Sequence, residues 1–509
     1  MDETTASTKE STETSVDAEA AGKAIEDSRH AGKLRAREAM LHGPIFKTMM
    51  RLALPTIGVL VAQTLVNVAE TFYVSRLGTE ALVGVALVFP IWMLMTMMSA
   101  GGIGGGVASA VARAFGAGRH EDANALVLHT LVVAVAFGLL FSVLAIGFGS
   151  HLYQASGGEG EALHSALIYS NFIFLAAVPI WIVNLLSAVL RGIGNVRVPA
   201  LVTFIGAAVL VPLSPAFIFG IGPIHGFGVA GAGIAVTLYY CAATLAMLLY
   251  MASGRSGLRL SLTRLRWPLF RDILKVGLLA ALNTVQLNLM VMLVTAAVGR
   301  FGVDAIGGYG TASRLDYVLV PILFGLGTAI LTMVGTNVGA GYIDRAKKIA
   351  WLGTAASVAI TETVGLLVAL FPGLWIGLFS HDSTVLGTGS LYFHIVAPAY
   401  AANGIVFALG FAAQGAGRVG WIFVAGAVRL LIAAGGGWFA VSVLGFSQAG
   451  LFAIVAFALI AAATICAAAT LSGAVWPAAD ETDPARRRGR PERRPSAKPH
   501  FHSKPDLRG

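Results

Sequence analysis

The chain carries the six-residue stretch RLGTEA at Arg76–Ala81, and a close copy of it, RFGVDA, follows at Arg300–Ala305. The stretch PIFK at Pro44–Lys47 returns at the same offset of 224 residues, as PLFR at Pro268–Arg271. Two later pairs keep an offset of 223 residues, namely Gly116–Gly118 with Gly339–Gly341 and Arg191–Gly194 with Gln414–Gly417. Chance seldom keeps one register over so long a distance, so the chain is predicted to contain two copies of one structural unit.

The composition indicates what kind of unit is repeated. The chain has 509 residues, of which 56% are hydrophobic and 12% are charged, and its mean hydropathy is +0.78. A soluble domain has roughly 25% charged residues. The apolar residues come in long runs, such as residues 131–148 and 454–472, and a run of about 20 apolar residues spans a bilayer as a helix. No strand-like alternation suggests a barrel, so the predicted fold class is an all-α membrane protein.

Twelve transmembrane helices are expected, six in each half. They lie near residues 50–75, 81–112, 122–148, 162–190, 198–220 and 228–252, and then near 272–298, 305–338, 346–370, 386–413, 419–444 and 449–473. Because six is an even number, each half enters and leaves on the same side of the membrane. The halves are therefore predicted to be two parallel six-helix repeats, with a substrate pathway between them.

Lysine and arginine gather in the loops that follow even-numbered spans. By the positive-inside rule these loops and both termini are predicted to be cytoplasmic, and the protein is expected to be multi-pass in the plasma (inner) membrane. Five segments are expected, namely a disordered cytoplasmic N-terminus at residues 1–43, a first lobe at 44–252, a cytoplasmic linker at 253–271, a second lobe at 272–476 and a basic disordered cytoplasmic tail at 477–509. We interpret the tail as an orienting segment that touches anionic lipid, not as a nucleic-acid-binding arm.

Motifs of enzymes and metal proteins are not found in the sequence. Cys241 and Cys466 lie singly in apolar runs without metal or redox spacing. The glycine-rich stretch at residues 101–106 matches neither a phosphate-binding loop nor a dinucleotide fingerprint, and close helix packing explains it better. A carrier and a membrane enzyme are the two classes considered. The carrier is favoured, with no catalytic residue, no metal and no cofactor apart from a coupling ion.

Glu70 is the first ionisable residue placed at membrane depth, fifteen residues after Pro55 on the first span. An intramembrane carboxylate is costly and needs a reason. It is interpreted as the group that binds H⁺ or Na⁺, and the alternative is a residue at the outer interface. Pro55 removes a helix hydrogen bond and is expected to act as a hinge.

The second half also places polar residues at membrane depth. Asp316 follows Arg314 too closely for the two to share a helix face, so a direct ion pair between them is not expected. Structural ion pairing and a role in a polar substrate pathway are both open for the acids. The candidates for the pathway are Gln286, Asn288, Asp316, Glu362 and Asn403.

Several motifs resemble those of the multidrug and toxic compound extrusion (MATE) family. They are Val68–Val74 (VAETFYV), Leu77–Ala81 (LGTEA), Leu190–Asn195 (LRGIGN), Gly228–Ala232 (GVAGA) and Gln414–Arg418 (QGAGR). The resemblance covers residues 44 to 473, and the DinF-like branch is the nearer one. It implies a V-shaped fold of two lobes that exports organic cations and other amphiphiles in exchange for H⁺ or Na⁺.

The resemblance also implies an ion-coupling site. Glu70 stands where the branch has an aspartate, and Asn184 matches an asparagine on the fourth span. Ser214 stands where the branch has a second acid, and Thr237 is next to a position that usually holds threonine. Since the second acid is missing, H⁺ is favoured over Na⁺, which needs several oxygen ligands.

The sequence does not name the substrate. Small amphiphilic or cationic molecules are expected, and a flippase of a lipid-linked substrate is the alternative. The expected partners are the small-molecule substrate and membrane lipids, without nucleic acid, and the chain is expected to be a monomer.

Overall fold

The structure is a computed structural model that describes residues 34–477, apart from 223, 259 and 262. The first half consists of helices joined by short loops and one small hairpin. The helices are α2 (Ile45–Ser75), α3 (Thr79–Met97), the π-helical turn η1 (Met98–Ile103), α4 (Gly104–Gly116), α5 (His120–Ala155), α6 (Gly160–Leu175), α7 (Ala177–Gly192), α8 (Arg197–Phe219) and α9 (Val229–Ala252). The hairpin pairs β1 (Gly220–Ile221) with β2 (Ile224–His225) in antiparallel register.

The second half repeats this order. Its helices are α10 (Trp267–Val298), the 3₁₀ turn η2 (Gly299–Phe301), α11 (Val303–Gly339), α12 (Ile343–Leu370), α13 (Pro372–Ile376), α14 (Ser383–Val396), the 3₁₀ turn η3 (Ala397–Ala399), α15 (Tyr400–Ala416), α16 (Gly420–Leu430), the π-helical turn η4 (Leu431–Gly436), α17 (Gly437–Ser442) and α18 (Gln448–Leu471).

The described residues contain eleven helices that are long and apolar enough to cross a membrane. The pair α6 and α7, which is bent by 48° at its junction, makes twelve when it counts as one span. The order of these spans confirms the predicted fold class of an all-α membrane protein with twelve transmembrane helices.

Glycines with positive φ show the internal repeat in the backbone. Gly78 and Gly302 both precede a long helix, with φ of 115° and 112° and ψ of 170° and 168°. Gly118 and Gly341, at φ of 70° and 84°, form the next equivalent turn. A side chain other than glycine is strained in this region of φ. The repeated letters therefore mark positions where both halves need the same turn.

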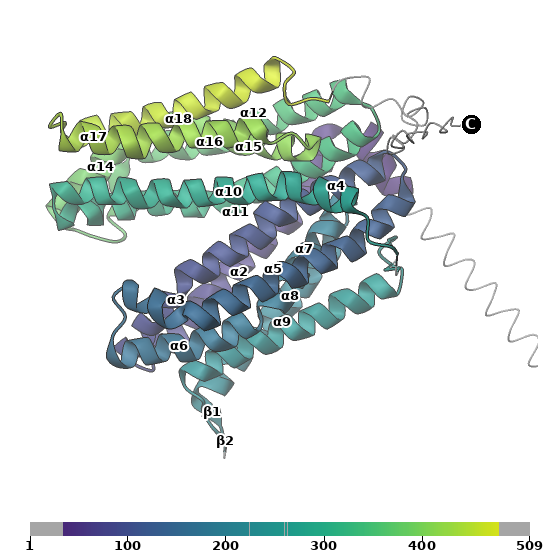
Figure 1. Ribbon diagram of the computed structural model, residues 1–509. Helices are drawn as coiled ribbons and strands as arrows, with labels where there is room; N and C mark the ends of the chain where they lie inside the picture. Colours follow the sequence, from purple (N-terminus) through teal and green to yellow (C-terminus); the bar gives the residue numbers. More distant parts are fainter. Residues whose placement is uncertain (1–33, 223, 259, 262, 478–509) are drawn as a thin grey trace, which may run out of the picture.

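Two lobes form a V (Figure 1). Helices α2 to α9 make one lobe and α10 to α18 the other; they lie close together around α4 and spread apart toward α3 and α6 on one side and α14 and α17 on the other. We call the end where the lobes lie close together the closed end, and the end where they spread apart the open end. One hydrophobic cluster joins the first lobe to the closed half of the second, and another lies wholly within the open half of the second lobe. The lobes thus share a core at the closed end.

Small residues bring the two lobes into contact at the closed end. A Cβ atom at Gly116 of α4 would collide with the backbone of Thr336, and one at Gly339 of α11 would collide with the backbone of Arg113. A Cβ at Gly335 would lie 2.9 Å from the Cβ of Ala112. Helices α4 and α11 are repeat partners, so equivalent faces of the two halves cross here, as small residues allow in membrane helices.

Two predicted segment boundaries were wrong. Residues 34–42 form a helix, although the whole of residues 1–43 was expected to be disordered. The helix is held because Met40 is buried and its carbonyl oxygen accepts a hydrogen bond of 3.1 Å from Asn337 Nδ2. The linker is also shorter than predicted, because α10 begins at Trp267 with Pro268 in its first turn, a position that suits proline. The expectations for residues 1–33 and for the tail from 478 onward lie outside the described residues.

Candidate functional site

Glu70 lies in the first lobe near the open end, five residues before α2 ends at Ser75. Its side chain is buried, and its Oε2 accepts a hydrogen bond of 2.9 Å from the hydroxyl of Ser214. Ser214 is fully buried and also lies five residues before the end of its helix, α8. This hydrogen bond therefore ties α2 to α8 through a carboxyl group.

The second carboxyl oxygen of this residue, Glu70 Oε1, is buried and has no hydrogen-bond partner in the described part of the chain. Tyr169 of α6 is close enough to interact electrostatically with Glu70, and its ring stacks on Trp92 of α3 with 6.4 Å between the centroids. A buried carboxylate with an unpaired oxygen is unfavourable, whereas the protonated acid carries no charge to desolvate. These surroundings suit a carboxyl group that gains and loses a proton.

The other two predicted ion ligands use their hydrogens elsewhere. Asn184 of α7 donates from Nδ2 to Ser99 Oγ in η1, at 2.7 Å. The hydroxyl of Thr237 in α9 donates to the carbonyl oxygen of Phe172, at 2.9 Å. The structure thus brings Ser214 into hydrogen-bond contact with Glu70, but neither Asn184 nor Thr237. Across residues 34–477, as far as they are described, no group of three or more His, Cys, Asp or Glu side chains could hold a metal ion.

Pro55 lies in the closed half of α2, where the two lobes meet. Helix α2 runs from Ile45 to Ser75 without a break, although the proline nitrogen cannot donate to the carbonyl of Arg51. A Cβ atom at Gly325 of α11 would collide with Ile57, two residues after Pro55. Pro55 therefore stands at the contact between the lobes and not beside Glu70.

A second polar cluster surrounds Asp316 of α11 in the open half of the second lobe. Arg429 of α16 lies close enough to attract the Asp316 carboxylate, and Tyr400 of α15 also lies near it. Asp316 Oδ1 and the Tyr400 hydroxyl make no hydrogen bond to any described residue. Arg314 is not the partner: its guanidinium lies 5.8 Å above the ring of Phe379. The acid and the arginine thus come from different helices of the second lobe. Three tyrosines share their surroundings, namely Tyr309, Tyr392 and Tyr400.

Glu362 of α12 has a structural contact. Its Oε2 accepts a hydrogen bond of 2.7 Å from the backbone nitrogen of Ala401, in the first turn of α15. The turn η3, which contains Pro398, interrupts the span just before this point. A carboxylate is favourable at a helix N-terminus because the first amide groups have no partner within the helix. Glu362 therefore stabilises the break in the tenth span.

The predicted amides of the second lobe differ in their burial and in their hydrogen bonds. Gln286 of α10 has a buried Oε1 without a hydrogen-bond partner in the described part of the chain. Asn288 is exposed and donates to the carbonyl oxygen of Thr284 in its own helix, at 2.9 Å. Asn403 is buried within α15. Among the described residues, the hydrogen bonds that Glu362 and Asn288 make therefore do not join them to Asp316 or to the other amides.

Sequence reasoning missed a polar contact that joins the lobes at the closed end. Arg113 of α4 forms an ion pair of 2.7 Å with Asp272 of α10 and donates to the carbonyl oxygen of Gly415 in α15, at 3.3 Å. It also donates to Ser109, whose hydroxyl donates to the carbonyl oxygen of Gln414. Arg113 and Asp272 are 159 positions apart, and no signal in the sequence pairs them.

Comparison with known proteins places the chain among membrane transporters. A family model described as MatE matches residues 55–216 and 280–439, in both lobes. The chain is 26% identical over 380 residues to a FAD transporter of Shewanella oneidensis, covering 73% of this chain and 83% of that protein. It is 27% identical over 354 residues to a probable multidrug resistance protein NorM of Thermotoga maritima, covering 69% of this chain and 76% of that protein.

A solved structure has the same fold. A MOP superfamily transporter from Pyrococcus furiosus Vc1 superposes with a TM-score of 0.78 at 23% sequence identity, covering 85% of this chain and 97% of that chain.

Proposed function

Since this chain belongs to the MatE family of membrane transporters, we propose that it is a secondary active antiporter, which exports amphiphilic or cationic small molecules in exchange for H⁺. The pairing of Glu70 with Ser214 carries this proposal. A proton needs one carboxyl group, and the buried, unpaired Oε1 of Glu70 gives it a place to bind. Na⁺ would need several oxygen ligands, and of the predicted ligands only Ser214 is hydrogen-bonded to Glu70.

The proton can be linked to movement because the carboxyl group connects two helices. When Glu70 is charged, Ser214 of α8 donates a strong hydrogen bond to it, and protonation weakens that bond. Helix α2 also carries Pro55 at the contact with α11, so a change at its open end reaches the contact between the lobes. An ion drives such a change only if it binds one arrangement better than the other. We propose that the proton favours one arrangement of the lobes and the substrate the other.

The proposed orientation places the closed end in the cytoplasm. The loops at this end hold most of the lysines and arginines between spans, which favours the cytoplasmic side. The arrangement in Figure 1 would then face the outside, with the route for the substrate between the diverging lobes. The same proposal places the protein in the plasma (inner) membrane as a monomer that works as a carrier and not as an enzyme.

Transport driven by a pH gradient tests the proposed role of Glu70. Purified wild type and Glu70→Gln are reconstituted in equal amounts into liposomes, and export of a fluorescent cationic dye is followed with and without the gradient. Glutamine resembles the protonated acid, so the variant should fold and bind dye but lose the response to the gradient. Glu80→Gln, which removes an exposed carboxylate ten residues further on, is the matched control. Equal gradient-driven rates for wild type and Glu70→Gln would refute the proposal.

A second substrate class is a phosphate-bearing dinucleotide, because one relative is a FAD transporter. The basic closed end of this chain favours it, since a pyrophosphate group attracts arginine and lysine. Uptake of FAD and of a cationic dye into inverted vesicles, measured side by side, separates the two classes. Transport of FAD without transport of the dye would show that the substrate is an anionic dinucleotide and not a cationic molecule.

A further inference from the structure

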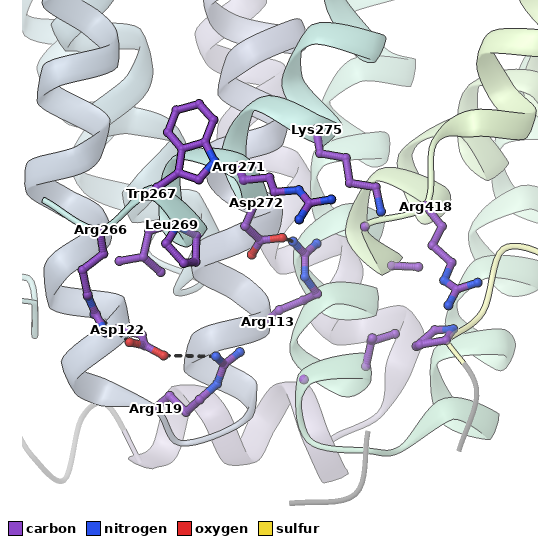
Figure 2. Close-up of a pocket in the computed structure, with 16 residues that line it drawn as sticks. Arg113, Arg119, Asp122, Arg266, Trp267, Leu269, Arg271, Asp272, Lys275 and Arg418 are labelled. Carbon is purple, nitrogen blue, oxygen red and sulfur yellow. Dashed lines mark hydrogen bonds and ion pairs between the residues drawn. The ribbon is translucent and has the colours of Figure 1, made fainter. Parts of the chain in front are cut away.

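A cavity of about 680 Å³ opens at the closed end between the two lobes. Ligand sites in proteins commonly measure about 300–1,000 Å³. The first lobe contributes residues at the end of α4 and the start of α5, and the second lobe contributes the first turns of α10 and the loop after α15 (Figure 2). Glu70 lies near the end of α2 that is at the open end of the molecule, so the cavity at the closed end is far from it.

The lining is strongly basic. It contains six arginine or lysine side chains and two aspartates, a formal excess of four positive charges. The six are Arg113, Arg119, Arg266, Arg271, Lys275 and Arg418. So many cations around one cavity repel one another, and an anion between them relieves that repulsion.

Both acids are already engaged. Asp272 pairs with Arg113, and Asp122 pairs with Arg119 at 3.0 Å and with Arg266 at 2.8 Å, as Figure 2 shows. The two aspartates are therefore paired with Arg113, Arg119 and Arg266.

Arg271 and Lys275 are the cations that remain for a ligand. They lie four residues apart on α10, so they share one face of the helix. Both are exposed, and neither has a carboxylate partner within the part of the chain that the structure describes. Guanidinium and ammonium groups of this kind bind phosphate oxygens through charge-assisted hydrogen bonds.

The start of α10 adds to the attraction. The helix is 32 residues long, and its first residue, Trp267, and the next two line the cavity. No side chain caps this helix end, so its first amide groups present partial positive charge. Trp267 is 69% exposed, as is usual for a tryptophan at a membrane interface.

We propose that this cavity binds a phosphate-bearing anion, through Arg271 and Lys275 together with the start of α10. The ligand is a phosphate group of an acidic phospholipid or of a soluble phosphate compound. The cavity itself lies between the lobes, because its lining comes from both. The site is separate from the proposed proton site, and its test does not depend on transport.

Binding is measured on the purified full chain by microscale thermophoresis with three probes. They are dioctanoyl phosphatidylglycerol, dioctanoyl phosphatidylcholine and inorganic pyrophosphate. Saturable binding of phosphatidylglycerol without binding of pyrophosphate identifies the lipid headgroup, and the reverse identifies a soluble phosphate compound. Affinity must fall as salt rises, because the attraction is between charges. Failure of both anionic probes to saturate, or equal affinity for the two lipids without binding of pyrophosphate, would overturn the proposal.

The double variant Arg271→Gln/Lys275→Gln should weaken binding about 30-fold, since each cation near an anion contributes roughly fivefold. Arg197→Gln/Lys348→Gln is the matched control, because both residues are exposed at the closed end and lie outside the cavity lining. It removes the same net charge and should change affinity less than threefold. Should the first double variant fail to fold, the two single variants are measured, each with an expected loss of about fivefold. Equal losses in the cavity variants and the control would show attraction to the whole basic surface and would overturn the site.

Discussion

Arg113→Ala tests whether the polar contact at the closed end holds the lobes together. The ion pair with Asp272 contributes at most about 1 kcal/mol, because the side chain of Asp272 is 45% exposed and water screens it. The hydrogen bond from the charged guanidinium to the carbonyl oxygen of Gly415 contributes about 1.5 kcal/mol. Together these give about 2 kcal/mol, so the variant should raise the ratio of open to closed molecules about 30-fold at this end.

Double electron–electron resonance can measure this ratio. Spin labels are attached to cysteines placed at Ser253 in the first lobe and Lys348 in the second, two exposed positions at the closed end, in a chain whose Cys241 and Cys466 are replaced. The variant should gain a population at longer distance.

Two further variants calibrate the result. Asp272→Asn removes only the ion pair, so it should have a smaller effect than Arg113→Ala. Asp344→Asn removes a carboxylate from a highly exposed pair with Lys347 and should change nothing. A folded Arg113→Ala protein with the wild-type distance distribution would refute the idea that this contact holds the lobes.

Three more variants probe other contacts. Ser214→Ala leaves both oxygens of Glu70 without a partner, and should lower the gradient-driven export rate while the fold is kept, as circular dichroism would show; unchanged export would argue against a working pair. Gly339→Leu must push α4 away from α11, and should lower the Tm by several degrees or shift the spin-label distances. If the variant changed neither the Tm nor the distances, that result would contradict the close crossing of α4 and α11. Glu362→Ala leaves the amide of Ala401 unpaired and should destabilise the protein by about 1–3 kcal/mol, with export per folded molecule unchanged, whereas Glu362→Gln keeps an acceptor and should lower the Tm less.

The repeat and the spans could be predicted because they depend on short-range physics. Apolar runs of span length, and glycines at turns with positive φ, act within a few residues of their own position. Gly78 and Gly302 could therefore be matched from letters alone, and the structure gives them the same backbone angles. The fold class followed from these local rules together with the count of spans.

Contacts between distant segments could be predicted only in part. The resemblance placed Glu70 and Ser214 in one site, and they share a hydrogen bond; it placed Asn184 and Thr237 there too, and each bonds elsewhere. A family pattern gives the helix but not the rotamer or the neighbour that a side chain selects. The pair of Arg113 and Asp272 depends on how one lobe sits against the other, which local patterns do not determine.

The π-helical turn η1 records a difference in length between the two halves. From Gly78 to Gly118 the chain advances 40 residues, whereas the matching interval from Gly302 to Gly341 takes 39. A π turn closes its hydrogen bonds over five residues where an α turn uses four, so it absorbs one extra residue without shifting the helix on either side. The turn lies at Met98–Ile103, inside the longer interval.

We interpret the extra residue in the first half as an insertion in that copy of the duplicated gene, or as a deletion in the other copy, after the two copies separated. The helix kept its register at both ends and took up the change as a bulge. Ser99, which receives the hydrogen bond of Asn184, lies in that bulge. A contact found in one lobe and not in its counterpart can therefore trace back to a length change of one codon.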